Sequence, residues 1–132
     1  MATRKLYATL CFSQGSYTLL TALWALADIQ SFVQVTGPKT DIWLVKTVAV
    51  LLVPYAICFL LAFRSLTENI LIVLLGLTSA AGLSFIDFYY SINGTISVIY
   101  QADGILQLLF IFLWGLYLIK SKEKGNKKAH NV

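Results

Sequence analysis

Charged residues are scarce in this chain of 132 residues, since aspartate, glutamate, lysine and arginine together make up only 12% of it. A soluble domain carries about 25% charged residues because its surface must be solvated. Apolar residues make up 58% of the chain, and the mean hydropathy is +0.77. These polar groups are too few to cover a small domain, so the composition excludes a water-soluble fold and indicates a protein embedded in lipid.

Histidine is almost absent too, because the one histidine, His130, lies in the C-terminal tail. No histidine-based metal or acid–base site is therefore expected in the apolar part of the chain. The sequence also lacks a phosphate-binding loop, an HExxH pair and a GxSxG motif. The two cysteines, Cys11 and Cys58, form no CxxC pair and are predicted to be buried. We predict no cofactor and no metal, and favour a non-enzymatic protein over an enzyme.

Four long apolar stretches make up most of the sequence. A helix needs about 20 apolar residues to cross a hydrocarbon core of about 30 Å. The predicted spans cover residues 6–27, 42–63, 69–90 and 98–119. They predict an all-α fold, a four-transmembrane-helix up-down bundle over residues 1–119, with a basic, disordered cytoplasmic tail over residues 120–132.

The first stretch has a second interpretation. Arg4 and Lys5, an apolar run and Ala25-Leu26-Ala27 resemble a secretory signal with its cleavage site. The apolar run is longer than the core of a signal peptide, and Gln14-Gly15 interrupts it. Both features favour a retained membrane span.

Lysine and arginine predict the orientation of the bundle. Eight of them fall on the side of the N-terminus: Arg4, Lys5, Arg64, Lys120, Lys122, Lys124, Lys127 and Lys128. Only Lys39 and Lys46 fall on the other side. The positive-inside rule then places both termini in the cytoplasm of a cell whose plasma membrane holds the protein. The tail lysines are expected to meet anionic inner-leaflet lipids, and nucleic acid is not an expected partner.

Polar residues inside the spans are the first candidates for function, because they are costly in lipid. Helix spacing places five such residues of the first span on one stripe: Gln14, Tyr17, Thr21, Trp24 and Asp28. In the third span, small residues four apart at Gly76, Ala80 and Ser84 predict a close helix contact beside Asp87. Asp103 and Gln107 lie one turn apart in the fourth span.

Three charged residues converge at one predicted depth. Lys46, Asp87 and Asp103 each lie roughly 4–9 Å below the outer boundary, at 1.5 Å per residue. We expect Lys46 to pair with Asp103 or Asp87, which leaves one carboxyl to be protonated, hydrated or matched by a cation or polar ligand. The predicted polar pocket comprises Lys46, Asp87, Asp103, Gln107, Tyr17, Trp43, Tyr90 and Tyr100. Pro54 is predicted to kink the second span.

Several strings are similar to those of small uncharacterised bacterial four-span membrane proteins. They are residues 37–48 (GPKTDIWLVKTV), 86–90 (IDFYY), 93–97 (NGTIS) and 99–103 (IYQAD). The resemblance implies a bacterial inner-membrane protein but no activity. In architecture the chain also resembles DoxX-like four-helix proteins. Small multidrug transporters have a similar length, but the glutamate of their first helix has no counterpart here beyond Gln14.

Three functions stay open on the sequence. The first is a protein whose outward-facing polar pocket binds a small ligand or a lipid headgroup, or merely stabilises the bundle through an ion pair. The second is a subunit of an oligomeric transporter or channel, for which a homo-oligomer is expected because four helices scarcely enclose a pathway. The third is an acid–base membrane enzyme that uses Asp87 and Asp103.

Overall fold

The computed structural model describes residues 2–65 and 67–129 and builds them into five helices without any strand. The helices are α1 (Ala2–Ala27), α2 (Ile29–Thr36), α3 (Ile42–Arg64), α4 (Ile70–Ile92) and α5 (Ile99–Ala129). Each predicted span lies within one helix or begins one residue before it. The all-α prediction is confirmed.

Within the described part of the chain, three helices are long and apolar enough to cross a membrane: α3, α4 and residues Ile99–Gly125 of α5. The other candidate is a bent pair, in which α2 turns away from α1 by 115° after a break at Asp28. By length and composition, the described residues therefore contain three helices that could span a membrane, or four if α1 and α2 together form one broken span.

Helix α2 lies in a segment that the sequence predicted only as a connection. Asp28 begins it as the N-cap, and its carboxylate accepts a hydrogen bond from the backbone N–H of Ser31 at 3.1 Å. The indole Nε1 of Trp24 donates to Ser31 Oγ at 2.7 Å, which ties the end of α1 to the start of α2. Gly37 ends α2 with a φ of +91°, a conformation that suits glycine.

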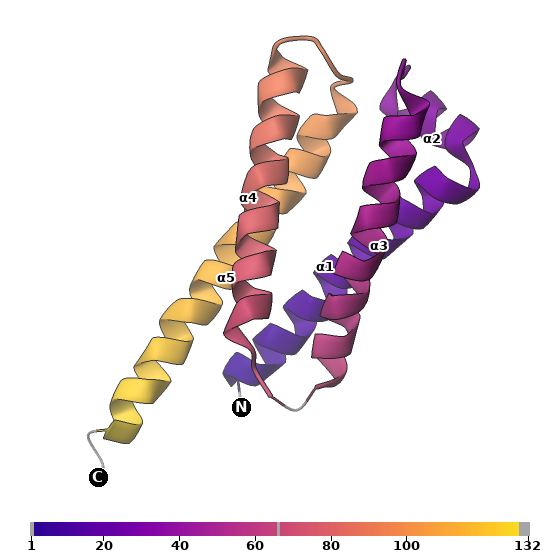
Figure 1. Cartoon of the computed structure of the whole chain (residues 1–132). Coiled ribbons are helices and arrows are strands. Elements are labelled where there is room, and N and C mark those ends of the chain that lie inside the picture. The colour runs from indigo at the N-terminus through magenta and orange to yellow at the C-terminus, as the bar shows by residue number, and fades with distance from the viewer. Residues whose placement is uncertain (1, 66, 130–132) are drawn as a thin grey trace.

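The helices form two pairs that meet at one end of the molecule (Figure 1). Helix α1 packs along α3, α4 packs along α5, and contacts between α1 and α5 join the pairs. The start of α1, the α3–α4 turn and the end of α5 lie at the same end, here named the basic end because it holds Arg4, Lys5 and Arg64. The opposite end, named the acidic end, holds the connections at 37–41 and 93–98.

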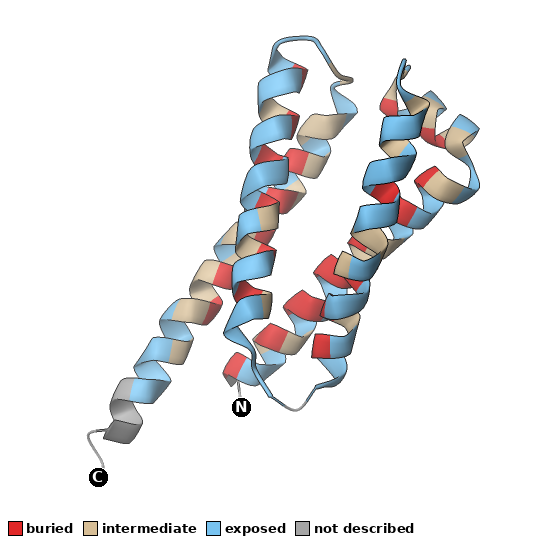
Figure 2. Cartoon of the chain, viewed as in Figure 1, coloured by how far each residue is buried: buried red, intermediate tan, exposed pale blue. Residues whose placement is uncertain are grey.

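Burial follows the contacts between helices (Figure 2). Leu10, Cys11, Phe59 and Trp114 are fully buried where the two pairs meet. Large apolar side chains on the outward faces are exposed, as expected of helices that face lipid. The stripe of small residues on α4 is buried together with Asp87, which confirms the predicted helix contact.

Two further details differ from the sequence-based expectations. Helix α5 continues past Ile119 to Ala129, where a disordered tail was expected. Lysine and glutamate are good helix formers, and a helix nucleated in the span can extend into them. Cys58 is exposed, because only one face of α3 meets α1. Pro54 is exposed within α3 and faces away from the core, and the kink predicted there stays a prediction. Residues 130–132 of the expected tail lie outside the described residues.

Candidate functional site

A pocket of about 370 Å³ lies between α1, α2 and α5 near the acidic end. Helix α2 contacts α5, so the bend after Asp28 brings α2 over the space between α1 and α5. This α1–α2–α5 pocket is lined by Tyr17, Thr21, Trp24, Phe32, Val35, Thr36, Ile99, Tyr100, Ala102, Asp103 and Leu106. Its volume is within the range of small-molecule sites, about 300–1,000 Å³.

The Asp103 carboxylate is the one acidic group on the pocket wall. Tyr17 Oη donates to Asp103 Oδ1 at 2.8 Å from across the helix interface. Gln107 Nε2 donates to the same oxygen at 3.0 Å from the next turn of α5. No described residue donates to Oδ2, so this oxygen is the carboxylate atom left for a ligand. We name these three residues the Asp103 cluster.

Asp87 lies in the contact between α4 and α5 and is 4% exposed. One helical turn earlier on α4, Ser84 Oγ donates to the carbonyl oxygen of Gly104 at 3.4 Å. This bond joins α4 to α5 at the residue after Asp103, so Asp87 and Asp103 belong to the same region of the α4–α5 contact. Among the described residues, Asp87 Oδ2 is one of two buried side-chain oxygens without a hydrogen-bond partner, the other being Thr3 Oγ1.

Aromatic rings supply much of the remaining pocket wall. Trp24 and Phe32 meet edge to face with their ring centroids 5.4 Å apart. The ammonium group of Lys39 lies 4.9 Å from the centroid of the Tyr100 ring, and it donates to the Thr36 carbonyl oxygen at 3.0 Å. The Tyr100 ring therefore already has a cation in contact with it.

The predicted pocket is only partly assembled. Tyr17, Tyr100 and Asp103 line it, and Gln107 supports Asp103 from behind. Asp87 is buried nearby but does not line it.

The predicted residues on α3 lie elsewhere. Lys46 and Trp43 are exposed on the free face of α3, and no described carboxylate forms an ion pair with Lys46. The expected pairing of Lys46 with Asp87 or Asp103 is therefore not formed. The physical cause is the packing of the helices, because α3 packs along α1 and has little contact with α4, which carries Asp87, or with α5, which carries Asp103. Tyr90 lines a separate hollow of about 810 Å³ between the two connections of the acidic end.

The pocket residues on α2 were not predicted from the sequence. Phe32 and Thr36 are buried on one face of α2, four residues apart, and both line the pocket. The signal was present in the aspartate at 28 followed by apolar residues with helical spacing. Eight residues are too few to span a membrane, so this segment does not stand out in a search for spans.

A second polar cluster lies closer to the basic end and joins all four long helices. The Gln14 side chain on α1 accepts from Trp114 Nε1 on α5 at 2.8 Å. It donates to the Gly76 carbonyl oxygen on α4 and to Tyr55 Oη on α3, both at 3.2 Å. Tyr55 Oη also hydrogen-bonds to Ser79 Oγ. This Gln14 network agrees with the interhelical role expected of a polar residue in a span.

The chemistry available in the α1–α2–α5 pocket is that of a negative, aromatic site. Its lining contains one carboxylate, two hydroxyl-bearing threonines, several aromatic rings and no lysine or arginine. Within the described residues, no three His, Cys, Asp or Glu side chains lie close enough together to hold a metal ion. Comparison of the chain with protein-family models, with curated proteins and with solved structures finds no match in any of the three.

Proposed function

We propose that the chain is an integral membrane protein that binds a small organic ammonium ion in the α1–α2–α5 pocket, either as a free molecule or as the headgroup of a lipid. In this proposal α1 and α2 form the first, bent span of an up-down bundle with four crossings. Both termini lie in the cytoplasm, in accord with the positive charge of the basic end. The pocket then faces the outer side of the plasma membrane.

The observation that carries the proposal is the Asp103 carboxylate beside aromatic rings in a pocket whose lining has no basic side chain. A carboxylate at membrane depth is costly unless it is paired, hydrated or neutralised. Tyr17 and Gln107 stabilise one of its oxygens but bring no positive charge. A ligand with an ammonium group would supply that charge.

The aromatic residues favour an organic cation. Tryptophan, tyrosine and phenylalanine attract ammonium groups to their ring faces, and cages of such rings are used to recognise quaternary ammonium ligands. The rings of Tyr17, Trp24, Phe32 and Tyr100 all line the space beside Asp103. The contact of Lys39 with the Tyr100 ring is an internal example of the same interaction.

Binding of choline to the purified protein in detergent, measured by isothermal titration calorimetry, tests the proposal. The neutral isostere 3,3-dimethyl-1-butanol has the same shape without the charge and is expected to bind at least tenfold more weakly, because charge-assisted contacts contribute about 1.5–3 kcal/mol. Asp103→Asn should lower choline affinity at least tenfold. Glu123→Gln removes the same charge from an exposed position on α5 and should leave affinity unchanged.

Equal binding of choline and its neutral isostere would contradict the proposal, as would an Asp103→Asn protein that is folded and binds choline normally. Lipid nanodiscs separate the two sources of the ammonium group. If a lipid headgroup is the ligand, choline should bind more weakly in phosphatidylcholine nanodiscs than in phosphatidylglycerol nanodiscs. If a free molecule is the ligand, the affinity should be the same in both.

A transport subunit is the second candidate function, supported by the arrangement of the two helix pairs. They are joined mainly through α1 and α5, and α3 makes few contacts with α4. Rocking of one pair against the other is a known form of alternating access. Uptake of radiolabelled choline into liposomes would distinguish transport from binding alone, and absence of uptake by a protein that binds choline would exclude transport of that cation.

A further inference from the structure

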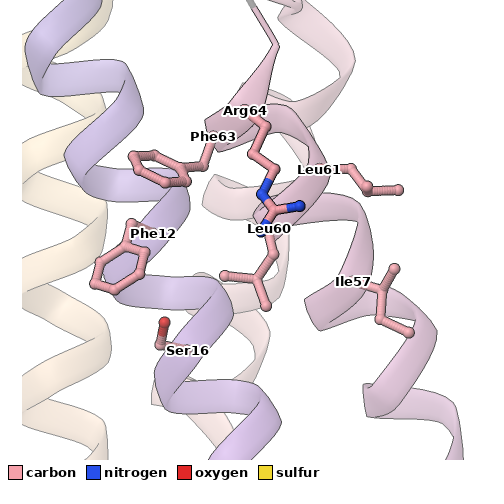
Figure 3. Close-up of a pocket in the computed structure, with 7 residues that line it drawn as sticks. All are labelled: Phe12, Ser16, Ile57, Leu60, Leu61, Phe63 and Arg64. Carbon is pink, nitrogen blue, oxygen red and sulfur yellow. The ribbon is translucent and has the colours of Figure 1, made fainter.

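A separate groove lies between α1 and α3 in the basic half of the molecule, outside the α1–α2–α5 pocket (Figure 3). Its volume is about 360 Å³, and it is lined by Phe12, Ser16, Ile57, Leu60, Leu61, Phe63 and Arg64. We name it the α1–α3 groove. The lining is apolar apart from one hydroxyl group and one guanidinium group.

We propose that the α1–α3 groove holds one acyl chain of an anionic phospholipid and that Arg64 binds its phosphate. The Arg64 side chain turns back from the end of α3, so that its guanidinium lies beside Leu60, as Figure 3 shows. Arg64 is the last residue of α3, so it lies at the basic end, where a lipid headgroup would lie. A guanidinium matches a phosphate through two parallel hydrogen bonds.

The groove has the dimensions and walls of a site for one acyl chain. From Ile57 to Arg64, α3 rises about 10 Å, and one leaflet contributes about 15 Å of hydrocarbon. The groove thus covers about two thirds of a single leaflet. The rings of Phe12 and Phe63 lie 5.2 Å apart and close one side of it. Beside the groove, α1 and α3 are in close contact, because a Cβ added at Gly15 would lie 2.9 Å from Phe59 Cβ and 3.2 Å from the Ala56 carbonyl oxygen.

Charge selects an anionic lipid over a zwitterionic one. No described carboxylate forms an ion pair with Arg64. The closest acid in the sequence, Glu68, accepts a hydrogen bond from Tyr117 Oη at 2.7 Å on the side of α5. Arg64 therefore has its positive charge available at the mouth of the groove. In phosphatidylcholine, the choline group would bring a second positive charge to the same place.

Native mass spectrometry of the purified protein with phosphatidylglycerol or phosphatidylcholine of identical acyl chains tests the inference. We expect one phosphatidylglycerol molecule per chain to be retained about tenfold more than phosphatidylcholine, the size of effect that charge-assisted hydrogen bonds produce. Arg64→Gln should abolish this preference. Arg4→Gln removes the same charge from the same end but outside the groove, and should preserve it.

A variant that fills the groove gives a second measurement. Ser16→Phe should displace the acyl chain and lower retention of both lipids, while circular dichroism reports an unchanged helix content. If Arg4→Gln and Arg64→Gln lose the preference for phosphatidylglycerol equally, the preference comes from the overall positive charge of the basic end and not from the groove. That result would overturn the inference. Normal retention of phosphatidylglycerol by a folded Ser16→Phe protein would overturn it as well. The same comparison in the Asp103→Asn background removes any phosphatidylcholine that is held by its headgroup in the α1–α2–α5 pocket, so the two proposals can fail independently.

Discussion

The Gln14 network and the Asp103 cluster each include a polar residue of the same stripe on α1, Gln14 in one and Tyr17 in the other, yet they differ in how completely their atoms are paired. In the Gln14 network, the amide oxygen and both amide hydrogens of Gln14 have partners on three other helices. In the acidic half, both bonds to Asp103 reach one oxygen, and buried Asp87 Oδ2 has no described partner. A network whose polar atoms all have hydrogen-bond partners needs no role beyond helix packing. A cluster with unpaired polar atoms leaves atoms to which a ligand can bind.

The same contrast appears in how tightly the helices approach. At Gly76, an added Cβ would lie 2.5 Å from the indole nitrogen of Trp114 and 3.1 Å from Gln14 Oε1. Trp114 is fully buried and cannot move aside without disrupting the core. At Gly104, in the acidic half, the added atom would meet the ring of Phe88, which is only half-buried. Near the basic end, buried side chains pack directly against the Gly76 backbone, whereas the neighbour of Gly104 is a half-buried ring with more room to move.

The largest expected effect on stability comes from a substitution at Gly76, where the helices near the basic end approach most closely. Gly76→Ala should lower the free energy of unfolding by about 2–3 kcal/mol, because overpacking a filled core forces side chains and backbone to shift. Gly82→Ala is the matched control on the same helix, since nothing lies within 4 Å of its added Cβ. Unfolding in mixed micelles with increasing dodecyl sulfate, followed by tryptophan fluorescence, would compare them. Equal stability of the two variants would contradict the tight packing assigned to Gly76.

Removing the amide of Gln14 should have the next largest effect. Gln14→Leu deletes three interhelical hydrogen bonds, and at about 0.6 kcal/mol for each such bond in a membrane the loss is about 2 kcal/mol. Gln101→Leu makes the same change on α5, where Gln101 has no described side-chain hydrogen bond. The same unfolding assay measures both. A stability of Gln14→Leu equal to that of Gln101→Leu would show that the network does not hold the helix pairs together.

The smallest expected effect is a change at Asp87 near the acidic end, and here the free energy of unfolding should rise instead of fall. Asp87→Asn keeps the shape of the side chain and removes a carboxylate whose burial is only partly compensated. We expect the free energy of unfolding to rise by about 1 kcal/mol or to stay the same. Asp41→Asn is the control, because Asp41 is exposed and its side chain makes no cap hydrogen bond to α3. A fall as large as that of Gln14→Leu would mean that Asp87 is a structural residue.

Much of the candidate site was visible along individual helices. The spacing of Tyr17, Thr21 and Trp24 placed them on one stripe, and all three line the pocket. The i, i+4 pair of Asp103 and Gln107 is hydrogen-bonded as its spacing suggested. What failed was the pairing between helices, since Lys46 lies at a suitable depth but on the wrong face of α3. Depth can be counted from residue numbers, whereas rotation about a helix axis depends on the neighbouring helix.

The sequence by itself determined that the chain is helical and which stretches its long helices contain, apart from the extension of α5 beyond Ile119. Its long apolar stretches and the residues between them are local properties, and they specify hydrogen bonding within each helix. Only the tertiary structure decided that α1 pairs with α3 and α4 with α5, and that α2 bends back over α5. These choices arise because a few side chains, such as Gln14, Trp24 and Trp114, find partners on other helices. Such contacts join residues up to 100 positions apart, so no local pattern could reveal them.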